Sequence, residues 1–180
     1  MRYFISDTHF CHDEIISLQN RPFRNTSEMD KYMIEQWKKT VRPEDEVIFG
    51  GDFACASPDI ARSICDMLPG RKILVKGNHD RSEKTMLAIG FSEVHSYLEL
   101  RTGYGPILVV HKPKRVTAKL ERAARNGHYN YILYGHTHSH LIPKSRWINM
   151  SVEQNAYTPQ TLDNLIEAHT LERGRLFSLP

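Results

Sequence analysis

Five short apolar segments of the chain end abruptly in polar residues, and this pattern constrains the fold more than any other feature. Residues 3–6, 47–51, 73–77, 107–110 and 131–135 form these segments, which are rich in Val, Ile, Leu, Phe and Tyr. Continuous apolar runs, as opposed to alternating ones, are typical of strands buried on both faces. The pattern therefore predicts a sheet system whose strands are covered on both sides.

Amphipathic helical patterns lie between several of these segments, and the alternation of strand and helix predicts an α/β fold. The first helix is expected to open in a capping box formed by Ser27 and Asp30 and to end near Val41. Two more helices are expected over about residues 116–125 and from about Thr161 onward, the latter burying an apolar side. Residues 91–105 are expected to add one or two strands.

One further helix has a clear start and stop in the sequence. Ser57 is expected to cap it, with Pro58 at its first position, and Pro69-Gly70 is expected to end it. Its buried side is expected to carry Ile60, Ile64 and Leu68.

The bulk composition bounds the class of protein. A length of 180 residues suits a single domain over residues 1–180. Lys and Arg total 24 and Asp and Glu total 21, and a net charge of +3 is far from the basic excess of a dedicated nucleic-acid-binding module. Three cysteines without a Cys-x-x-Cys pair favour a reducing, cytoplasmic setting. No apolar run approaches the ~18 residues of a membrane span, and the N-terminal one is too short for a signal peptide.

The polar residues that follow the five segments are the candidate functional site. In open α/β sheets, sites form beyond the carboxyl ends of the strands, so these residues are expected to meet at one rim. They are Asp7, His9, Asp52, Asn78, His79, His111, His136 and His138.

Their side chains suit a centre with two metal ions. Such a centre needs one carboxylate that reaches both ions, because the metals sit ~3.5–4 Å apart. Asp52 follows two glycines that allow close backbone approach, and is the expected bridging ligand. Asp7 and His9 alternate along what we expect to be an extended segment, so both can face one ion. Asn78 adds an amide oxygen.

The motif order Asp-x-His, Gly-Asp, Gly-Asn-His-Asp, His and Gly-His-x-His resembles the calcineurin-like metallophosphoesterase superfamily. The resemblance spans residues 7–138. Residues 20–23 (Asn-Arg-Pro-Phe) and 149–152 (Asn-Met-Ser-Val) are similar to a small bacterial and phage branch of that family. The resemblance implies a four-layer α/β/β/α fold, with two packed mixed β-sheets flanked by helices.

The resemblance also implies roles for individual residues. A hydroxide bridging two metal ions would attack a phosphate ester, with His79 as the proton donor. The ions would be divalent transition metals, with Mn first and Fe, Zn or Ni as the other candidates. One ion would be bound by Asp7, His9, Asp52 and His138. The other would be bound by Asp52, Asn78, His111 and His136.

One departure from the family pattern bears on the substrate. The Ser/Thr protein phosphatases of this superfamily follow Gly-Asp with Asp-Arg-Gly, whereas Phe53 and Ala54 follow Asp52 here. A protein phosphatase is therefore disfavoured, and another group must grip the phosphate. The candidates for substrate contact are Arg21, Arg24, His12, Lys112 and Arg115, with Lys114 beside the last two.

Two other functions compete with the enzyme. The same fold occurs in scaffolds that have lost activity, such as a retromer subunit of similar size; the complete ligand set and His79 argue for catalysis instead. A nucleic-acid-binding module is disfavoured because no aromatic platform alternates with a basic stripe. The sequence favours a small phosphorylated partner with a phosphodiester or nucleotide character, such as a nucleotide or a nucleic-acid end. Neither a membrane nor an obligate protein partner is expected.

Overall fold

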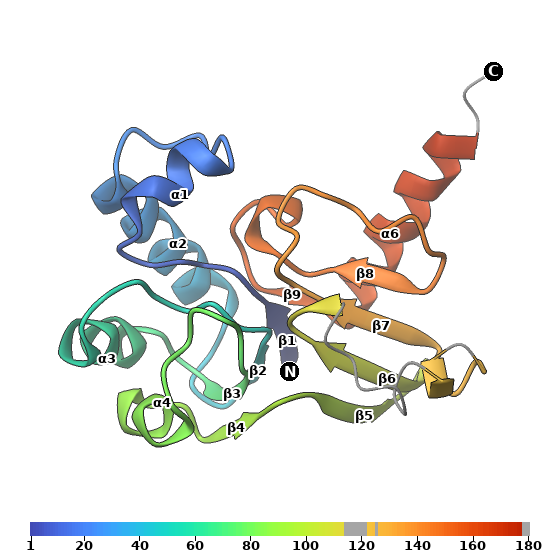
Figure 1. Cartoon of the computed structure of the whole chain (residues 1–180), viewed down its shortest axis with the longest axis horizontal. Helices are drawn as coiled ribbons and strands as arrows, with labels where there is room; N and C mark the ends of the chain where they lie inside the picture. Colours follow the sequence, from blue (N-terminus) through green and yellow to red (C-terminus); the bar gives the residue numbers. More distant parts are fainter. Residues whose placement is uncertain (114–121, 125, 178–180) are drawn as a thin grey trace.

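The chain folds around two β-sheets, which we describe from a computed structural model of residues 1–113, 122–124 and 126–177 (Figure 1). The first sheet has five strands in the order β4-β3-β2-β1-β9. The strands β1 to β4 run parallel to one another, and β9 is antiparallel to β1. Their bounds are β1 Arg2–Ile5, β2 Glu46–Phe49, β3 Arg71–Val75, β4 Glu93–His95 and β9 Gln160–Thr161.

The second sheet has four strands in the order β5-β6-β7-β8. An antiparallel pairing joins β5 to β6, and parallel pairings join β6, β7 and β8. Their bounds are β5 Leu98–Thr102, β6 Gly105–Val110, β7 Tyr131–Tyr134 and β8 Trp147–Asn149. Both sheets are thus mixed, as predicted, and all five apolar segments form parallel strands. Their carboxyl ends deliver the polar residues to the junction of the two sheets.

Helices cover the outer face of the first sheet, on the left in Figure 1. The helices α2 (Thr26–Thr40), α3 (Pro58–Met67) and α4 (Glu83–Ile89) bury their apolar sides there, and the short α1 (Asp13–Leu18) follows β1. The C-terminal helix α6 (Leu162–Phe177) follows β9. No helix in the described ranges has both the length and the apolar character needed to cross a membrane.

The core lies on both faces of the first sheet. Alternate residues of β1 show this: Phe4 packs between the two sheets, while Ile5 packs beneath the helices. Leu165 of α6 completes the cluster between the sheets, and Trp37 of α2 anchors the cluster under the helices. Each such fully buried large side chain contributes about 1.5–3 kcal/mol. Burial on both faces explains why these strands read as continuous apolar runs.

The outer face of the second sheet is covered in part by the segment preceding β7. Ala123 and Ala124 pack there against a cluster that includes Tyr129 and Tyr134. Residues 122–124 are helical, and the other residues of the helix expected over 116–125 lie outside the described residues.

The structure corrects two expectations about helices. The cap of α2 is Asn25, whose side chain accepts a hydrogen bond from the Glu28 backbone N–H, so the predicted capping box at Ser27 is wrong. Ile60 is 52% exposed and not buried. The buried stripe of α3 runs through positions 61, 64, 65 and 68, which places Ile60 at its margin. The cap at Ser57 and the Pro58 start of α3 are confirmed.

Candidate metal centre

Two loops that follow β1 and β2 run side by side and form the floor of the site. The backbone N–H of Asp7 donates to Gly51 O (2.9 Å), that of His9 to Asp52 O (3.1 Å) and that of Phe10 to Phe53 O (2.9 Å). These bonds continue the pairing of the two strands past their ends. They hold the Asp-x-His segment against Asp52.

The backbone at the site is strained, contrary to the extended conformation that we expected. Five of the expected ligands have positive φ angles between 49° and 69°, a region that costs about 1–2 kcal/mol for residues other than glycine. Left-handed residues alternate with others, so Asp7 and His9 turn their side chains to the same place. The residues concerned are Asp7, His9, Asp52, His136 and His138.

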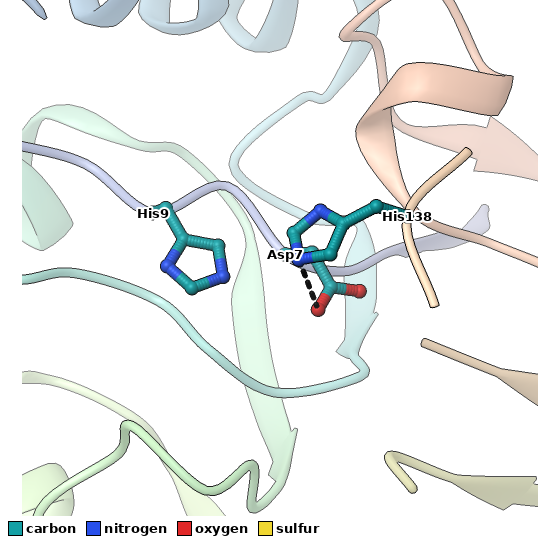
Figure 2. A group of neighbouring side chains, drawn as sticks. All are labelled: Asp7, His9 and His138. Atoms are coloured by element: carbon teal, nitrogen blue, oxygen red, sulfur yellow. Dashed lines mark ion pairs between the residues drawn. The ribbon is translucent and has the colours of Figure 1, made fainter. Parts of the chain in front are cut away.

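A first group of side chains combines Asp7, His9 and His138, which come from the ends of β1 and β7 (Figure 2). One potential ligand atom from each lies within 4.8 Å of the others. The Nε2 atom of His138 is 3.9 Å from Oδ1 of Asp7. All three residues are buried.

A second group combines Asp52, His111 and His136, again within 4.8 Å of one another. Asn78, at the end of β3, points its amide oxygen at this group, with Oδ1 3.1 Å from Nε2 of His111. The seven residues expected as ligands are therefore brought together in two adjacent groups.

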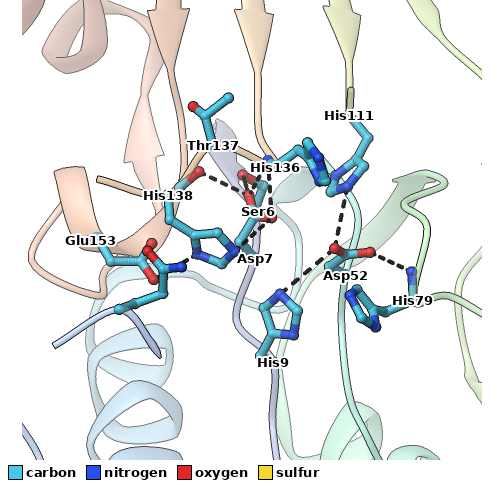
Figure 3. Close-up of polar contacts among 12 residues, drawn as sticks. Ser6, Asp7, His9, Asp52, His79, His111, His136, Thr137, His138 and Glu153 are labelled. Carbon is cyan, nitrogen blue, oxygen red and sulfur yellow. Dashed lines mark hydrogen bonds and ion pairs between the residues drawn. The ribbon is translucent and has the colours of Figure 1, made fainter. Parts of the chain in front are cut away.

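Asp52 lies between the two groups (Figure 3). Its Oδ2 atom is 3.6 Å from Nε2 of His9 in the first group and 3.3 Å from Nε2 of His111 in the second. Its Oδ1 atom accepts the backbone N–H of His79 at 2.8 Å. One carboxylate oxygen is thus within reach of both groups, as a bridging position requires.

Hydrogen bonds orient two of the imidazoles. With His111 donating from Nδ1 to Gly50 O (2.8 Å) and His138 donating from Nδ1 to Glu153 Oε1 (2.8 Å), each ring turns Nε2 toward the site. Metal-binding histidines are characteristically held in this way by a carbonyl or carboxylate.

For three of the candidate ligands, Asp52, His9 and His136, the electrostatics favour the protonation state that metal binding needs. Burial by itself would raise the pKa of Asp52, but His111, the His79 N–H and His9 hold that pKa at about 2. Burial lowers the pKa of His9 to about 2 and, with His111 and Lys112 adding to it, lowers the pKa of His136 to about 4. Near neutral pH the bridging candidate is a carboxylate and these two imidazoles are neutral, as metal binding demands.

The residues present fit a pair of cations. The Nε2 atom of His9 is fully buried and has no hydrogen-bond partner within the described part of the chain, which is costly unless a cation is bound. Burial also raises the pKa of Asp7, a penalty that a cation would offset. Glycine is also needed beside both aspartates. A Cβ atom at Gly77 would lie 2.1 Å from Asp52 Oδ1, and one at Gly135 would lie 2.5 Å from Asp7 Oδ2, so a side chain at either position would displace the carboxylate.

Two further histidines border the groups. The ring of His79, an exposed residue, lies 5.2 Å from the ring of His9 between centroids. His12 Nδ1 is 3.1 Å from His9 Nδ1, and the His12 and His79 rings are 6.2 Å apart. His79 therefore stands at the open side of the site, and His12 contacts a candidate ligand.

The cationic residues expected to contact substrate are placed differently from one another. Arg21 is buried, and its guanidinium group is bonded within the protein, so the expected phosphate grip by Arg21 is not supported. Arg24 is exposed and pairs with Glu28. Lys112, partly exposed, is near enough to His136 to lower its pKa. Arg115 lies outside the described residues.

Several residues that support the site carried no assigned role at the sequence level. Ser6 and Ser151 donate hydroxyl hydrogen bonds to Asp7 Oδ2 at 2.5 and 2.9 Å. Asp80 accepts backbone N–H bonds from Asp52, Phe53 and Gly77. Asp80 is the last residue of the Gly-Asn-His-Asp motif and Ser151 lies within Asn-Met-Ser-Val. Both supporting residues could therefore have been found from the motifs that the sequence shares with the family.

The motif order agrees with comparisons to known proteins. A family model described as the calcineurin-like phosphoesterase superfamily domain matches residues 2–153, which include both groups. An uncharacterized protein from Methanocaldococcus jannaschii is 32% identical over 183 residues, covering 97% of this chain and 93% of that protein. A solved structure of a protein of unknown function from Aquifex aeolicus is similar, with 29% identity, a TM-score of 0.75, and coverage of 93% of this chain and 98% of that chain. The chain therefore belongs to the calcineurin-like phosphoesterase superfamily.

Proposed function

We propose that this protein is a metal-dependent phosphoesterase that uses two divalent ions. The observation that carries the proposal is the position of Asp52 Oδ2, within 3.6 Å of a candidate ligand in each of the two groups. Two ions held here would lower the pKa of a bound water and neutralise phosphate oxygens as charge shifts during attack on phosphorus. Membership in the superfamily supports the same chemistry.

The proposed ligand sets follow the two groups. Asp7, His9 and His138 would hold one ion, and Asn78, His111 and His136 would hold the other, with Asp52 shared. Mixed carboxylate, amide and imidazole donors suit Mn²⁺ first, with Fe, Zn²⁺ or Ni²⁺ as alternatives.

His79 is the proposed proton donor to the leaving group. Its backbone N–H is held by Asp52 Oδ1, which fixes the residue next to the proposed bridging carboxylate. Its side chain is exposed at the open side of the site, where a leaving oxygen would emerge. Donation at that point lets a poorly stabilised alkoxide depart as an alcohol.

The proposed substrates are small phosphodiesters or nucleotides. A monoester dianion carries more charge than a diester and benefits more from a guanidinium grip. Arg21 is bonded within the protein and Arg24 pairs with Glu28, which leaves Lys112 as the cation that the described residues place beside the second group. A site where the described residues offer few free cations suits the singly charged diester better.

Two measurements test the proposal. Purified apo-protein is titrated with Mn²⁺, and activity is then measured on bis-aryl phosphates, 2′,3′-cyclic nucleotides, nucleoside monophosphates and phosphoproteins. We expect two ions per chain and the highest kcat/KM on diesters. Two bound ions with no activity on any member of the panel would favour the alternative of a scaffold that retains the fold. A preference for phosphoproteins would contradict the proposed substrate class.

Matched variants test the grip on phosphate. Lys112→Ala is expected to raise KM, whereas Arg24→Ala is expected to leave KM unchanged, because the Arg24 side chain is already paired with Glu28 of α2. A larger effect of Arg24→Ala on KM would indicate that the loop before α2, and not Lys112, contacts the phosphate.

A further inference from the structure

We infer that Arg21 and Glu153 form a buried positioning pair dedicated to the ion of the first group. The inference rests on the proposed function and extends it beyond the ligands. Arg21 lies in the loop after α1, and Glu153 lies in the 3₁₀ turn after β8 (Val152–Gln154). Both act through the ligands that they hold.

The guanidinium group of Arg21 uses all five of its N–H donors inside the protein. Nη2 donates to Asp7 O (2.7 Å) and Nη1 to Thr8 O (2.8 Å). The remaining donors bind Glu153 Oε1, through Nε and Nη2, and the sulfur of Met29. Arg21 therefore clamps the two carbonyls that lie between the side chains of Asp7 and His9.

Those carbonyls belong to the strained part of the loop. Asp7 and His9 have φ angles of 59° and 50°, and a backbone in this region persists only when its surroundings hold it. A planar, five-donor guanidinium can bond two successive carbonyls and a carboxylate together, which a lysine cannot do. Arg21 thus stabilises the turn that aims both ligands at one point.

Glu153 connects the same clamp to the third ligand of the first group. Its Oε1 atom accepts the Nδ1–H of His138 at 2.8 Å, and both residues are labelled in Figure 3. The same oxygen also accepts two N–H groups of Arg21. The carboxylate holds the His138 ring with Nε2 facing Asp7. The side chains of Arg21 and Glu153 are 0% and 6% exposed, so each neutralises the other where water does not reach.

The contacts of the pair are restricted to one group. They reach Asp7, Thr8 and His138, and within the described part of the chain neither residue forms a hydrogen bond or ion pair with Asn78, His111 or His136. The second group has its own support, since His111 is held by Gly50 O. Loss of the pair should therefore weaken one ion and spare the other.

Mn²⁺ binding to apo-protein tests this selectivity. Glu153→Met is introduced into two backgrounds: His111→Asn, which leaves the first group, and His138→Asn, which leaves the second. We expect Mn²⁺ to bind about 10–100-fold more weakly when Glu153→Met is added to His111→Asn. We expect no change when it is added to His138→Asn. Equal weakening in both backgrounds, or none in either, overturns the inference.

Conservative and matched variants separate positioning from general stability. Glu153→Gln keeps an oxygen that can accept the His138 Nδ1–H, so it should restore part of the lost affinity. Lys72→Met is the control for loss of a buried cation: Lys72 Nζ donates to Leu68 O (2.7 Å) and Gly70 O (3.1 Å), away from both groups. It should lower thermal stability yet keep both ions. Weakened Mn²⁺ binding in Lys72→Met would count against a dedicated pair.

Failure of Glu153→Met to fold, and failure of the unmodified protein to bind two ions, are distinguished from rejection of the pair as follows. If Glu153→Met does not fold because Arg21 is left unpaired, the double variant Arg21→Met/Glu153→Met removes both charges and is measured in its place. If the unmodified protein binds fewer than two Mn²⁺ ions, the proposed function fails first. If it binds two and the variants bind them equally well, only the positioning pair is rejected.

Discussion

Oδ2 of Asp52 lies 3.6 Å from Nε2 of His9, a buried nitrogen with no hydrogen-bond partner among the described residues. The same oxygen is 3.3 Å from Nε2 of His111. The two imidazoles belong to different groups, so a single carboxylate oxygen of Asp52 lies next to both groups.

Asp52→Asn is therefore expected to be the most damaging ligand substitution. It should weaken Mn²⁺ binding at both groups and lower kcat/KM more than His9→Asn, which should retain the second ion. Metal content per chain and kcat/KM are measured on the same preparations. Similar metal content and residual activity in the two variants would argue against a bridging role.

Asp80 should matter for stability even though it belongs to neither of the two candidate ligand groups. Its carboxylate accepts N–H bonds from Asp52 (2.9 Å), Phe53 (3.0 Å) and Gly77 (2.7 Å), joining the loops after β2 and β3. Both carboxylate oxygens accept these bonds, so an asparagine at this position would turn its NH₂ group toward at least one of the backbone N–H donors. Asp80→Asn is expected to destabilise the apo-protein by about 1–3 kcal/mol, measured by chemical denaturation.

Asp66 on α3 provides the control for this substitution. It is exposed, and Asp66→Asn should stay within about 0.5 kcal/mol of the unmodified protein. Equal stability of the two variants would show that Asp80 does not hold the loops.

Gly51 is expected to tolerate no side chain. Its φ is +99°, and a Cβ atom there would lie 2.6 Å from Gly77 N and 2.7 Å from His111 Nδ1. Gly51→Ala should cost roughly 2–4 kcal/mol of stability and reduce metal content by displacing His111. Gly103→Ala is the matched control, because nothing lies within 4 Å of a Cβ atom at that position. Comparable unfolding midpoints for the two variants would contradict the close approach.

The strands and the meeting of the candidate ligands could be predicted because both follow from local pattern. A continuous apolar run predicts a doubly covered strand, and parallel strands end at the same edge. The runs before Asp7, Asp52 and Asn78 become β1, β2 and β3 of one sheet. The runs before His111 and His136 become β6 and β7 of the other, and the two edges meet where the His136 N–H bonds Asp7.

Other features depend on tertiary contacts that no local pattern contains. Arg21 and Glu153 pair across 132 positions, so a phosphate grip and a buried clamp are equally consistent with the sequence around Arg21. The left-handed backbone of Asp7 and His9 is held by bonds to the loop after β2 and to the guanidinium group of Arg21, which are contacts between segments distant in the sequence. The helix α4 has only seven residues, too few for a clear period, although its Ser82 cap and Gly90 stop were a usable signal.

The three cysteines should differ in reactivity. Burial raises the pKa of Cys65 to about 11, and burial together with Asp30 raises the pKa of Cys11 to about 11. The thiolate is the reactive form, so at pH 8 roughly one in a thousand of these thiols is ionised. Cys55 is exposed and should be alkylated first by iodoacetamide, as read by peptide mass spectrometry. Faster labelling of Cys65 than of Cys55 in native protein would contradict this ranking; unfolded protein, in which all three react, is the control.

His79 is expected to separate metal binding from proton donation. Its backbone N–H, and not its side chain, holds Asp52, so His79→Asn should keep the Asp52 contact and both ions. The lost side chain should lower kcat/KM for alkyl or nucleoside esters by about 10²–10⁴-fold, because their leaving oxygens need a proton. Nitrophenyl esters, whose leaving group departs as a stable anion, should be affected far less. The measurement is kcat/KM across esters with leaving groups of graded pKa, with metal content assayed alongside. An unchanged slope against leaving-group pKa would exclude the donor role, and loss of an ion would make His79 a ligand instead.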